Sequence, residues 1–413
     1  MTTATLTRFP TGYDQHLINL RVVHEIHTSE RRSFRGCRRR WHWIFRENYY
    51  PMTTAKPLEF GIAYHKAMEV LHSPETWMLN HLVLGALAEK AFVDTCKEQL
   101  AAYLKARDMY GLEGDESRDY EERMALGRGM IWYYVHNQLP ALQKEFTPSH
   151  VEVSFDVPLL DEDKRILRCK CPTCRKSFAR AGGTAKLGKW YGNPIVISGR
   201  VDLIVYDEYG NYWLWDWKTA ARLSTSEVFL DLDDQIATYC WAIRIGLGLN
   251  IQGFYYHEQR KGFPLPPVEL KQMRLGRMFS VSQQQDTDYD TYLRHVAEHD
   301  KGAYEAGLYD DFLYYLKEEG IKYYRRFKVV KTDYELWQVY KNLLAEVRDM
   351  TAPDLRIYPT PGRFSCDSCA FQVPCISRNQ GQDYEYTLQT LYLKQQPYYL
   401  RKVKSSTDKP GRA

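Results

Sequence analysis

The sequence of 413 residues lacks any long apolar run. No window approaches the ~20 consecutive apolar residues that a membrane-spanning helix needs, so we expect no membrane partner. The amino terminus has no apolar stretch of the length found in signal peptides, which favours a cytoplasmic protein. Internal repeats and low-complexity tracts are also missing, which argues against a repeat architecture.

An excess of charge of one sign is missing too. Fifty-six Lys and Arg against 52 Asp and Glu leave a net charge of +4, so any electropositive surface has to be local. One such run holds six arginines within ten residues: Arg31, Arg32, Arg35, Arg38, Arg39 and Arg40. The apolar content of 44% and charged content of 26% are typical of a globular protein with one large domain or two closely packed ones.

Cysteine, by contrast, is plentiful, with nine copies. In a cytoplasmic protein this favours metal binding over disulfides. Cys366 and Cys369 form a CxxC pair, and Cys375 follows six residues later, so three thiolates are close enough to hold one metal centre. A fourth ligand is needed, and Cys37, which lies among the arginines, is the natural candidate.

A second group of cysteines, Cys169, Cys171 and Cys174, lies in a polar segment that we interpret as an insertion at 161–194. Three thiolates suit Zn²⁺, with a fourth ligand from a histidine elsewhere or from a partner chain. The alternative is a flexible loop with reduced thiols, and the sequence favours neither. Cys96 and Cys240 lie on helical patterns and are interpreted as small buried apolar residues.

The hydrophobic pattern predicts an α/β protein with a mixed sheet. We expect helices near 58–72, 80–106 and 119–138, strands at 151–160, 194–206 and 211–219, a helix at 233–246 and a strand at 252–257. Further along, we expect a strand near 268–281 and helices at 288–306, 310–319 and 334–350.

The pair of strands around Tyr209 carries the most informative side chains. Positions pair symmetrically about a turn, so a turn centred on Tyr209 places Asp202 opposite Asp216 on one face. Lys218, two residues further, shares that face. Two carboxylates among apolar residues are costly to bury unless a cation lies between them. A solvated ion pair is the alternative interpretation of the same residues.

Five patterns occur together in this order: Gly61 and His65 as GxxxH, Gly199-Arg-Val-Asp202, Asp216-Trp-Lys218, Gln235 and Tyr239 as QxxxY, and the four cysteines that bracket them. In these motifs the chain resembles the PD-(D/E)XK nuclease superfamily. It looks like a member of the RecB-like branch with an iron-sulfur cluster, which includes CRISPR-associated and phage exonucleases and the AddB nuclease domain. The resemblance covers roughly residues 30–380 and implies a restriction-endonuclease-like αβββαβ core.

The resemblance also implies roles for these residues. Asp202, Asp216, the carbonyl of Trp217 and His65 would hold Mg²⁺ or Mn²⁺, and Lys218 would orient or deprotonate the attacking water. Gln235 and Tyr239 would support the site or the substrate strand. Cys37, Cys366, Cys369 and Cys375 would hold a structural 4Fe-4S cluster.

The implied activity is that of a DNA exonuclease acting on single strands or duplex ends in recombination, repair or phage DNA processing. A CRISPR adaptation nuclease is the nearest alternative, and a non-catalytic zinc-containing scaffold that binds nucleic acid is a different one. A homo-oligomer or a recombination or repair protein is the implied partner, and the cytoplasm would be that of the host cell if the protein is phage-encoded. The arginine run is expected to follow the DNA backbone next to the cluster.

These inferences divide the chain into five parts. We expect an amino-terminal segment at 1–57, a helical subdomain at 58–150, a nuclease core at 151–260 with its Cys-rich insertion, a helical region at 261–400 that closes the cluster, and a disordered tail at 401–413.

Overall fold

The computed structural model describes residues 23–52, 56–110, 116–169, 171, 174, 192–224, 227–320 and 322–395. The tail expected at 401–413 and most of the Cys-rich insertion lie outside the described residues. None of the described helices is long and apolar enough to cross a membrane.

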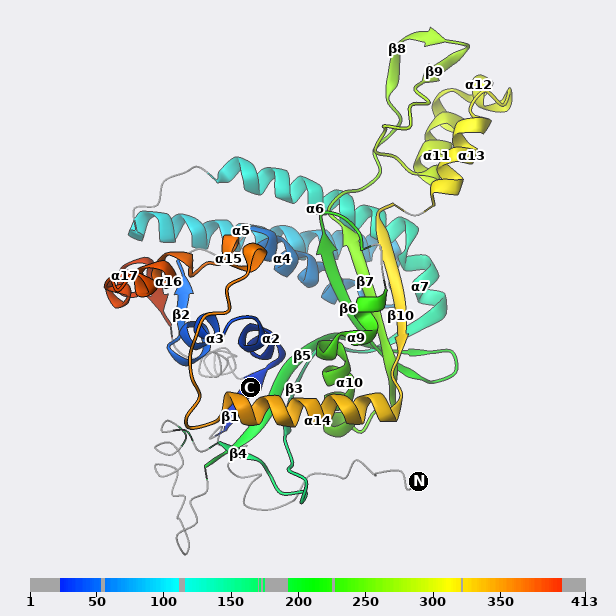
Figure 1. The fold of residues 1–413 in the computed structure, drawn as a ribbon. Coiled ribbons are helices and arrows are strands. Elements are labelled where there is room, and N and C mark those ends of the chain that lie inside the picture. Colours follow the sequence, from blue (N-terminus) through cyan, green and yellow to red (C-terminus); the bar gives the residue numbers. More distant parts are fainter. Residues whose placement is uncertain are drawn as a thin grey trace, which may run out of the picture.

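In the described chain, seven strands form one mixed sheet, as the sequence predicts (Figure 1). Along the sheet the order is β1 (His24–His27), β5 (Asn193–Asp207), β6 (Tyr212–Ala220), β7 (Ile251–Arg260) and β10 (Tyr324–Val330). The strands β3 (Phe146–Pro158) and β4 (Arg168–Cys169) also pair with β5. β1 runs parallel to β5 and β6 parallel to β7, whereas the other pairs are antiparallel.

Helices cover both faces of this sheet because its strands alternate apolar side chains between two cores. On β6, Trp213, Trp215 and Trp217 pack toward α4 (Lys56–Leu71), α5 (His81–Tyr110), α6 (Ser117–Asn137) and α7 (Leu139–Glu145). Leu214 packs into the other core, which α10 (Asp234–Leu247) and α14 (Asp333–Met350) help to build. Asp216 and Lys218 share the face of Leu214, so the polar residues of β6 lie on the α10 side.

Local signals explain where α10 and α14 begin. Asp233 caps α10 by accepting a hydrogen bond from the Gln235 amide at 2.7 Å. Thr332 and Glu335 form a reciprocal capping box at the start of α14. α10 ends at Gly248, whose φ of 70° is a left-handed conformation that glycine adopts without strain.

A small module stands away from the sheet beyond β7 (Figure 1). It contains β8 (Glu269–Arg274), β9 (Arg277–Phe279), α11 (Tyr289–His299), α12 (Lys301–Glu305) and α13 (Asp310–Glu319). The single strand predicted near 268–281 is wrong, because Leu275 and Gly276 have φ values of 54° and 77° and turn the chain into a hairpin. The single helix predicted at 288–306 is divided at Asp300, whose backbone leaves the helical region.

The two ends of the described chain meet in another module. α3 (Arg38–Trp41), the π-helix η1 (His42–Arg46) and β2 (Tyr49–Pro51) lie beside α15 (Arg363–Asp367), α16 (Gln372–Asn379), α17 (Tyr384–Leu391) and β11 (Tyr392–Lys394). β2 pairs with β11, and the Trp43 and Phe371 rings lie 5.7 Å apart. The helices α2 (Thr28–Gly36) and α9 (Val228–Leu232) complete the described elements. The pairing of β2 with β11, like strands β1 and β10, was not predicted, although the sequence placed Cys37 beside the carboxy-terminal cysteines.

Stability should depend on pH through His257, which is fully buried on β7 and stacks on Tyr324. Burial lowers the pKa of His257 from 6.5 to about 3. Below pH 6.5 the unfolded chain therefore binds a proton at His257 that the native chain does not bind. The contribution of neutral His257 to the unfolding free energy is thus fully present above pH 6.5 and is lost as the pH falls. We expect a loss of about 2 kcal/mol from this histidine by pH 5.

Urea unfolding at pH 7 and pH 5 would measure this loss. His257→Phe keeps the aromatic stacking and should show a smaller decrease in unfolding free energy between the two pH values than the wild type. Equal decreases in the two proteins would show that His257 does not cause the acid sensitivity.

Candidate active site

The β5–β6 hairpin brings the two predicted carboxylates together. Its register pairs Leu203 with Trp215 and Tyr206 with Tyr212, which is the symmetry about Tyr209 that the sequence predicts. One further step along this register places Asp202 opposite Asp216. In the turn, the Asp207 carboxylate accepts hydrogen bonds from the Tyr209 and Asn211 amides.

Asp202 lies where β5 changes partner. β1 pairs with residues 195–198 of β5, and β6 pairs with residues 203–206. Between these ladders, Asp202 Oδ2 accepts a hydrogen bond from the Trp217 amide at 3.2 Å. The N–H and C=O of one strand residue point to the same side, so the Trp217 carbonyl is directed to the edge that carries Asp202. Its role as a metal ligand stays a prediction.

A histidine and a further glutamate join Asp202. His65 Nδ1 on α4 lies 3.4 Å from Asp202 Oδ2. One ligand atom each from His65, Glu152 and Asp202 lie within 4.8 Å of one another. Glu152 was missed by sequence reasoning because it belongs to none of the motifs and is one of several acids near β3.

Glu152 has an unusual backbone. Its φ is 51°, although the neighbours Val151 and Val153 pair regularly with Leu203 and Val201 on β5. A left-handed residue other than glycine within a strand is strained, and such strain is concentrated at functional sites. Glu152 also forms an ion pair with Arg200 at 2.7 Å.

Asp216 is the most enclosed carboxylate of the site, with 9% of the residue exposed. Lys218 Nζ lies 2.5 Å from Asp216 Oδ2, but the pair is not aligned as a hydrogen bond. This oxygen is buried, and its partner among the described residues is the Lys218 ammonium. Enclosing two carboxylates beside a single ammonium is costly in a purely structural role.

The pKa values reflect this crowding. Burial raises the pKa of Asp216, and the Lys218 charge offsets the shift only in part. Burial would also raise the pKa of Asp202, but the contact with His65 outweighs it and the pKa is lowered. Burial would lower the pKa of Lys218, yet the charges of Asp216 and Asp202 hold it above the ordinary value. Lys218 is therefore an ammonium in this arrangement, which suits orientation and charge stabilisation better than proton abstraction.

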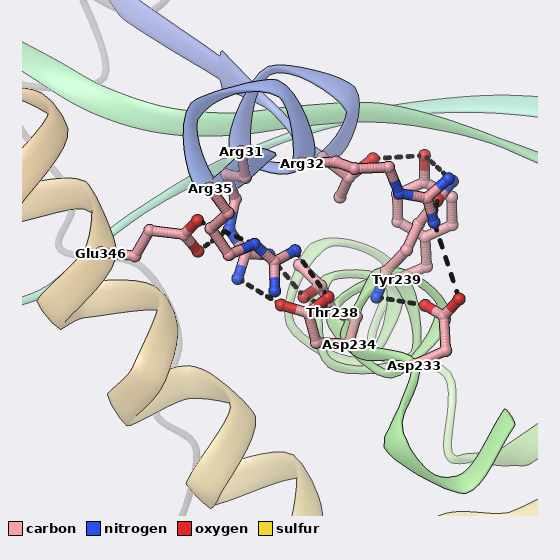
Figure 2. A network of polar contacts seen from close by, with 10 residues as sticks. Arg31, Arg32, Arg35, Asp233, Asp234, Thr238, Tyr239 and Glu346 are labelled. Carbon is pink, nitrogen blue, oxygen red and sulfur yellow. Dashed lines mark hydrogen bonds and ion pairs between the residues drawn. The ribbon is translucent and has the colours of Figure 1, made fainter. Parts of the chain in front are cut away.

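Gln235 and Tyr239 lie one turn apart on α10 beside these groups. The Tyr239 hydroxyl is 3.0 Å from Thr28 Oγ1 and 3.5 Å from Gln235 Nε2. Arg32 donates to Gln235 Oε1 at 3.0 Å. Figure 2 shows these contacts between α2 and α10. They position the two side chains from the amino-terminal helix, which the sequence did not predict.

The arginine run differs from the expected DNA-tracking surface, because several of its members pair inside the protein (Figure 2). The Arg31 side chain is only 1% exposed and pairs with Asp234 and Glu346 at 2.8 and 2.7 Å. Arg35 binds the same two acids. Arg39 is also buried and donates to Asn379 at 2.7 Å. Arg31 and Arg39 are therefore structural, whereas Arg35 remains about half exposed.

Arg32 and Arg40 are different, because they line a pocket of about 400 Å³ between α2 and the carboxy-terminal cysteine loop. Ser29, Phe45 and Cys369 are among its other lining residues. Two arginines of the run thus give this hollow a positive lining.

The structure brings Cys37 to the carboxy-terminal trio. Burial raises the pKa of the Cys369 thiol, and Cys37 and Cys366 lie close enough to add to the shift. Cys375 Sγ lies 3.3 Å from Arg39 Nη1. Among the described residues, no three of these four cysteines bring their sulfur atoms within 4.8 Å of one another.

The other cysteine group is tighter. One ligand atom each from Cys169, Cys171, Cys174 and His24 lie within 4.8 Å of one another. His24 comes from β1, in a segment for which the sequence suggested no role. Because His24 is 150 residues from Cys174 in sequence, no local motif indicates that the two side chains meet.

A family model of the PD-(D/E)XK nuclease superfamily matches residues 28–376, which contain both strands of the hairpin and the helices that bear His65, Gln235 and Tyr239. The chain belongs to the PD-(D/E)XK nuclease superfamily. No curated protein gives a significant match. Membership of this superfamily implies a nuclease that acts on nucleic acid and uses divalent metal ions.

The two motif glycines of this nuclease should respond differently to alanine. A Cβ at Gly199 would lie 2.5 Å from the Phe155 ring and 3.1 Å from the Tyr239 ring, whereas a Cβ at Gly61 would meet only Thr219 Oγ1 at 3.9 Å. Gly199→Ala should cost about 1–3 kcal/mol of unfolding free energy through overpacking. Gly61→Ala, inside helix α4, should increase it by about 0.5–1 kcal/mol.

Urea titrations of both variants would test this contrast, with Gly61→Ala as the matched control. A Gly199→Ala protein as stable as the wild type would show that Phe155 and Tyr239 are free to move.

Proposed function

We propose that this nuclease is a Mg²⁺- or Mn²⁺-dependent deoxyribonuclease that degrades single-stranded DNA or duplex ends. The observation that carries the proposal is the enclosed Asp216 carboxylate, which lies opposite Asp202 and beside the Lys218 ammonium. A structural hairpin gains nothing from that arrangement. A hydrolytic site needs it, because hard carboxylate oxygens are the ligands that these cations prefer.

His65, Glu152 and Asp202 present ligand atoms close enough to share one cation, and Asp216 lies opposite Asp202 but outside that group. Asp202 and Asp216 would hold it, with His65 and the Trp217 carbonyl as further ligands. Glu152 is the additional carboxylate of the set, because it lies within 4.8 Å of His65 and Asp202. When bound, the cation lowers the pKa of a water molecule and neutralises charge on the scissile phosphate.

The protein groups divide the remaining work. The Lys218 ammonium, held 2.5 Å from Asp216, can donate hydrogen bonds to a phosphate oxygen and orient the attacking water. Asp202 keeps His65 in place through their 3.4 Å contact. Tyr239 and Gln235, anchored by Thr28 and Arg32, face a neighbouring part of the substrate strand.

The pocket between α2 and the cysteine loop suggests how the strand approaches. Arg32 lines this pocket and also donates to Gln235, so the hollow adjoins the site. Arg40 adds a second cation, and Phe45 and Phe371 supply aromatic surface. Cations with interspersed aromatic rings are typical of single-strand binding.

The four cysteines around Cys37 support assignment to the RecB-like branch, with a 4Fe-4S cluster. A cubane places iron and sulfide between its thiolates, so its ligand sulfurs stand further apart than those around a single ion. The looser spacing of Cys37, Cys366, Cys369 and Cys375 agrees with a cluster better than with zinc. Arg39 and Arg40 nearby would offset the negative charge of the ligated cluster.

Anaerobically purified protein should be brown, with about four irons per chain, as ligation by four thiolates implies. Cys37→Ser should remove the colour and lower the melting temperature, because the cluster joins segments that are distant in sequence. Iron analysis and absorbance would measure this. Cys96→Ala is the matched control, and an equally brown Cys37→Ser protein would exclude Cys37 as a ligand.

The cellular role belongs to the same proposal. Recombination, repair or phage DNA processing fits an end-directed nuclease, either as a homo-oligomer or with a repair protein. A CRISPR adaptation nuclease would use the same site. A zinc-containing scaffold without catalysis is the alternative of another class, and the enclosed Asp216 argues against it.

A nuclease assay on end-labelled single- and double-stranded DNA tests the proposal. Purified protein with Mn²⁺ or Mg²⁺ should shorten labelled single strands progressively, and EDTA should stop the reaction. Covalently closed circular single strands should persist under the same conditions. Rapid cutting of the circles would instead indicate an endonuclease, and no cutting of any DNA would overturn the proposal.

A further inference from the structure

A second cluster of metal-ligating side chains lies outside the active site. His24 on β1 meets Cys169 on β4 and the Cys171–Cys174 pair, although His24 and Cys174 are 150 residues apart in sequence. One ligand atom from each of the four lies within 4.8 Å of the others. His24 Nδ1 is 3.3 Å from Cys174 Sγ.

This spacing is that of ligands around a single ion. Tetrahedral zinc with Zn–S bonds of about 2.3 Å places its sulfur ligands about 3.8 Å apart. The Cys174 amide donates a hydrogen bond to Cys171 Sγ at 3.4 Å. No cysteine of the described chain forms a disulfide.

We propose that His24, Cys169, Cys171 and Cys174 bind one structural Zn²⁺. Four protein ligands complete a tetrahedral shell and leave no position for substrate, which distinguishes a structural from a catalytic zinc. Cys169 and Cys174 are 0% and 4% exposed, and three crowded thiolates require a cation to balance them. The proposal does not depend on the proposed nuclease activity.

The surroundings of His24 fit ligation through Nδ1. Its other ring nitrogen, Nε2, lies 3.4 Å from Arg46 Nη2. When Nδ1 binds zinc, Nε2 carries the ring proton, so this long contact is given up. Arg46 keeps its stronger partners, because it pairs with Glu30 at 2.8 Å and lies over the Trp41 ring.

The zinc would anchor the amino-terminal segment to the sheet. β1 contributes one short ladder to β5, and Cys169 pairs with Asn193 at the start of the same strand. β1 leads directly into α2, whose Thr28 and Arg32 hold Tyr239 and Gln235. Zinc at this junction would therefore stabilise the register of the segment that supports the active site.

Metal analysis of full-length protein purified without immobilised metal columns tests the proposal. We expect about one zinc per chain in the wild type. Cys171→Ser and His24→Ala should each lower the zinc content at least fivefold and leave the iron content unchanged. Cys366→Ser should retain zinc, and so should the matched control Cys96→Ala. Loss of zinc from Cys366→Ser alone would overturn the assignment.

Wild-type protein provides a test that does not require a folded variant. Titration with a mercurial thiol reagent, followed with a zinc-sensitive dye, should release one zinc per chain. Protein grown with cobalt in place of zinc should show the visible ligand-field bands of tetrahedral cobalt, and these should be absent from Cys171→Ser. Intact mass two units lower than expected, with no zinc released, would reveal a disulfide instead and refute the site. Zinc-free protein with all thiols reduced would refute it as well.

Discussion

Asp216→Asn should abolish the metal-dependent cutting of labelled single-stranded DNA while leaving the fold intact. The substitution keeps the shape of the side chain but removes the charge of the carboxylate that Lys218 contacts. Loss of this proposed metal ligand removes several kcal/mol of transition-state stabilisation, so the rate should fall by about 10³ or more. Initial rates with saturating Mn²⁺, together with circular dichroism spectra, measure both parts of this expectation.

Glu208→Gln is the matched control, because Glu208 is an exposed carboxylate in the turn of the same hairpin. It should cut DNA at the wild-type rate. Lys218→Met separates ligation from catalysis, since it should retain Mn²⁺ binding in a calorimetric titration and still lose most of the rate. An Asp216→Asn enzyme with wild-type rate would remove Asp216 from the site.

The β5–β6 hairpin is predictable from sequence because its pairing is local. Asp202 and Asp216 are related by one turn centred on Tyr209, and the symmetry of a hairpin determines which positions face each other. The alternation of Trp and polar residues on β6 determines the face. Neither step requires knowledge of the rest of the chain, and the structure shows the same register.

Contacts between distant segments are not predictable in this way. His24 meets Cys174 only because β1 adds to β5, and a four-residue strand has too short a pattern to be recognised. β10 was missed for a related reason, because it joins the sheet as a single strand far from β7 in sequence. Glu152 depends on a positive φ, a backbone property that the identity of a glutamate does not indicate.

The arginine run shows that clustered cations can also serve the protein interior. Clustered cations suggest a surface for DNA, yet three helices use Arg31 to close a buried junction. α2 contributes the guanidinium, α10 contributes Asp234 and Thr238, and α14 contributes Glu346 (Figure 2). The same junction holds α2 against α10, and therefore holds Thr28 against Tyr239. Stability and site geometry thus share one ion-pair network.

Arg31→Met should consequently be the most destabilising of the arginine substitutions. It leaves Asp234 and Glu346 without their buried partner and removes the 3.0 Å hydrogen bond to Thr238. Breaking a buried network by removing one member typically costs about 3–5 kcal/mol. Urea unfolding would measure the loss, and amide exchange in α10 should accelerate in the same variant.

Arg35→Met provides the matched control, because Arg35 contacts the same two acids at 3.0 and 3.2 Å but is 48% exposed. Solvent screens that pair, so the cost should be about 1 kcal/mol or less. Arg31→Lys should remain nearly as destabilised as Arg31→Met, since one ammonium does not reproduce the fork that reaches three partners. Equal losses of unfolding free energy in Arg31→Met and Arg35→Met would mean that burial does not distinguish the two arginines. The junction between α2, α10 and α14 would then be a surface ion-pair cluster.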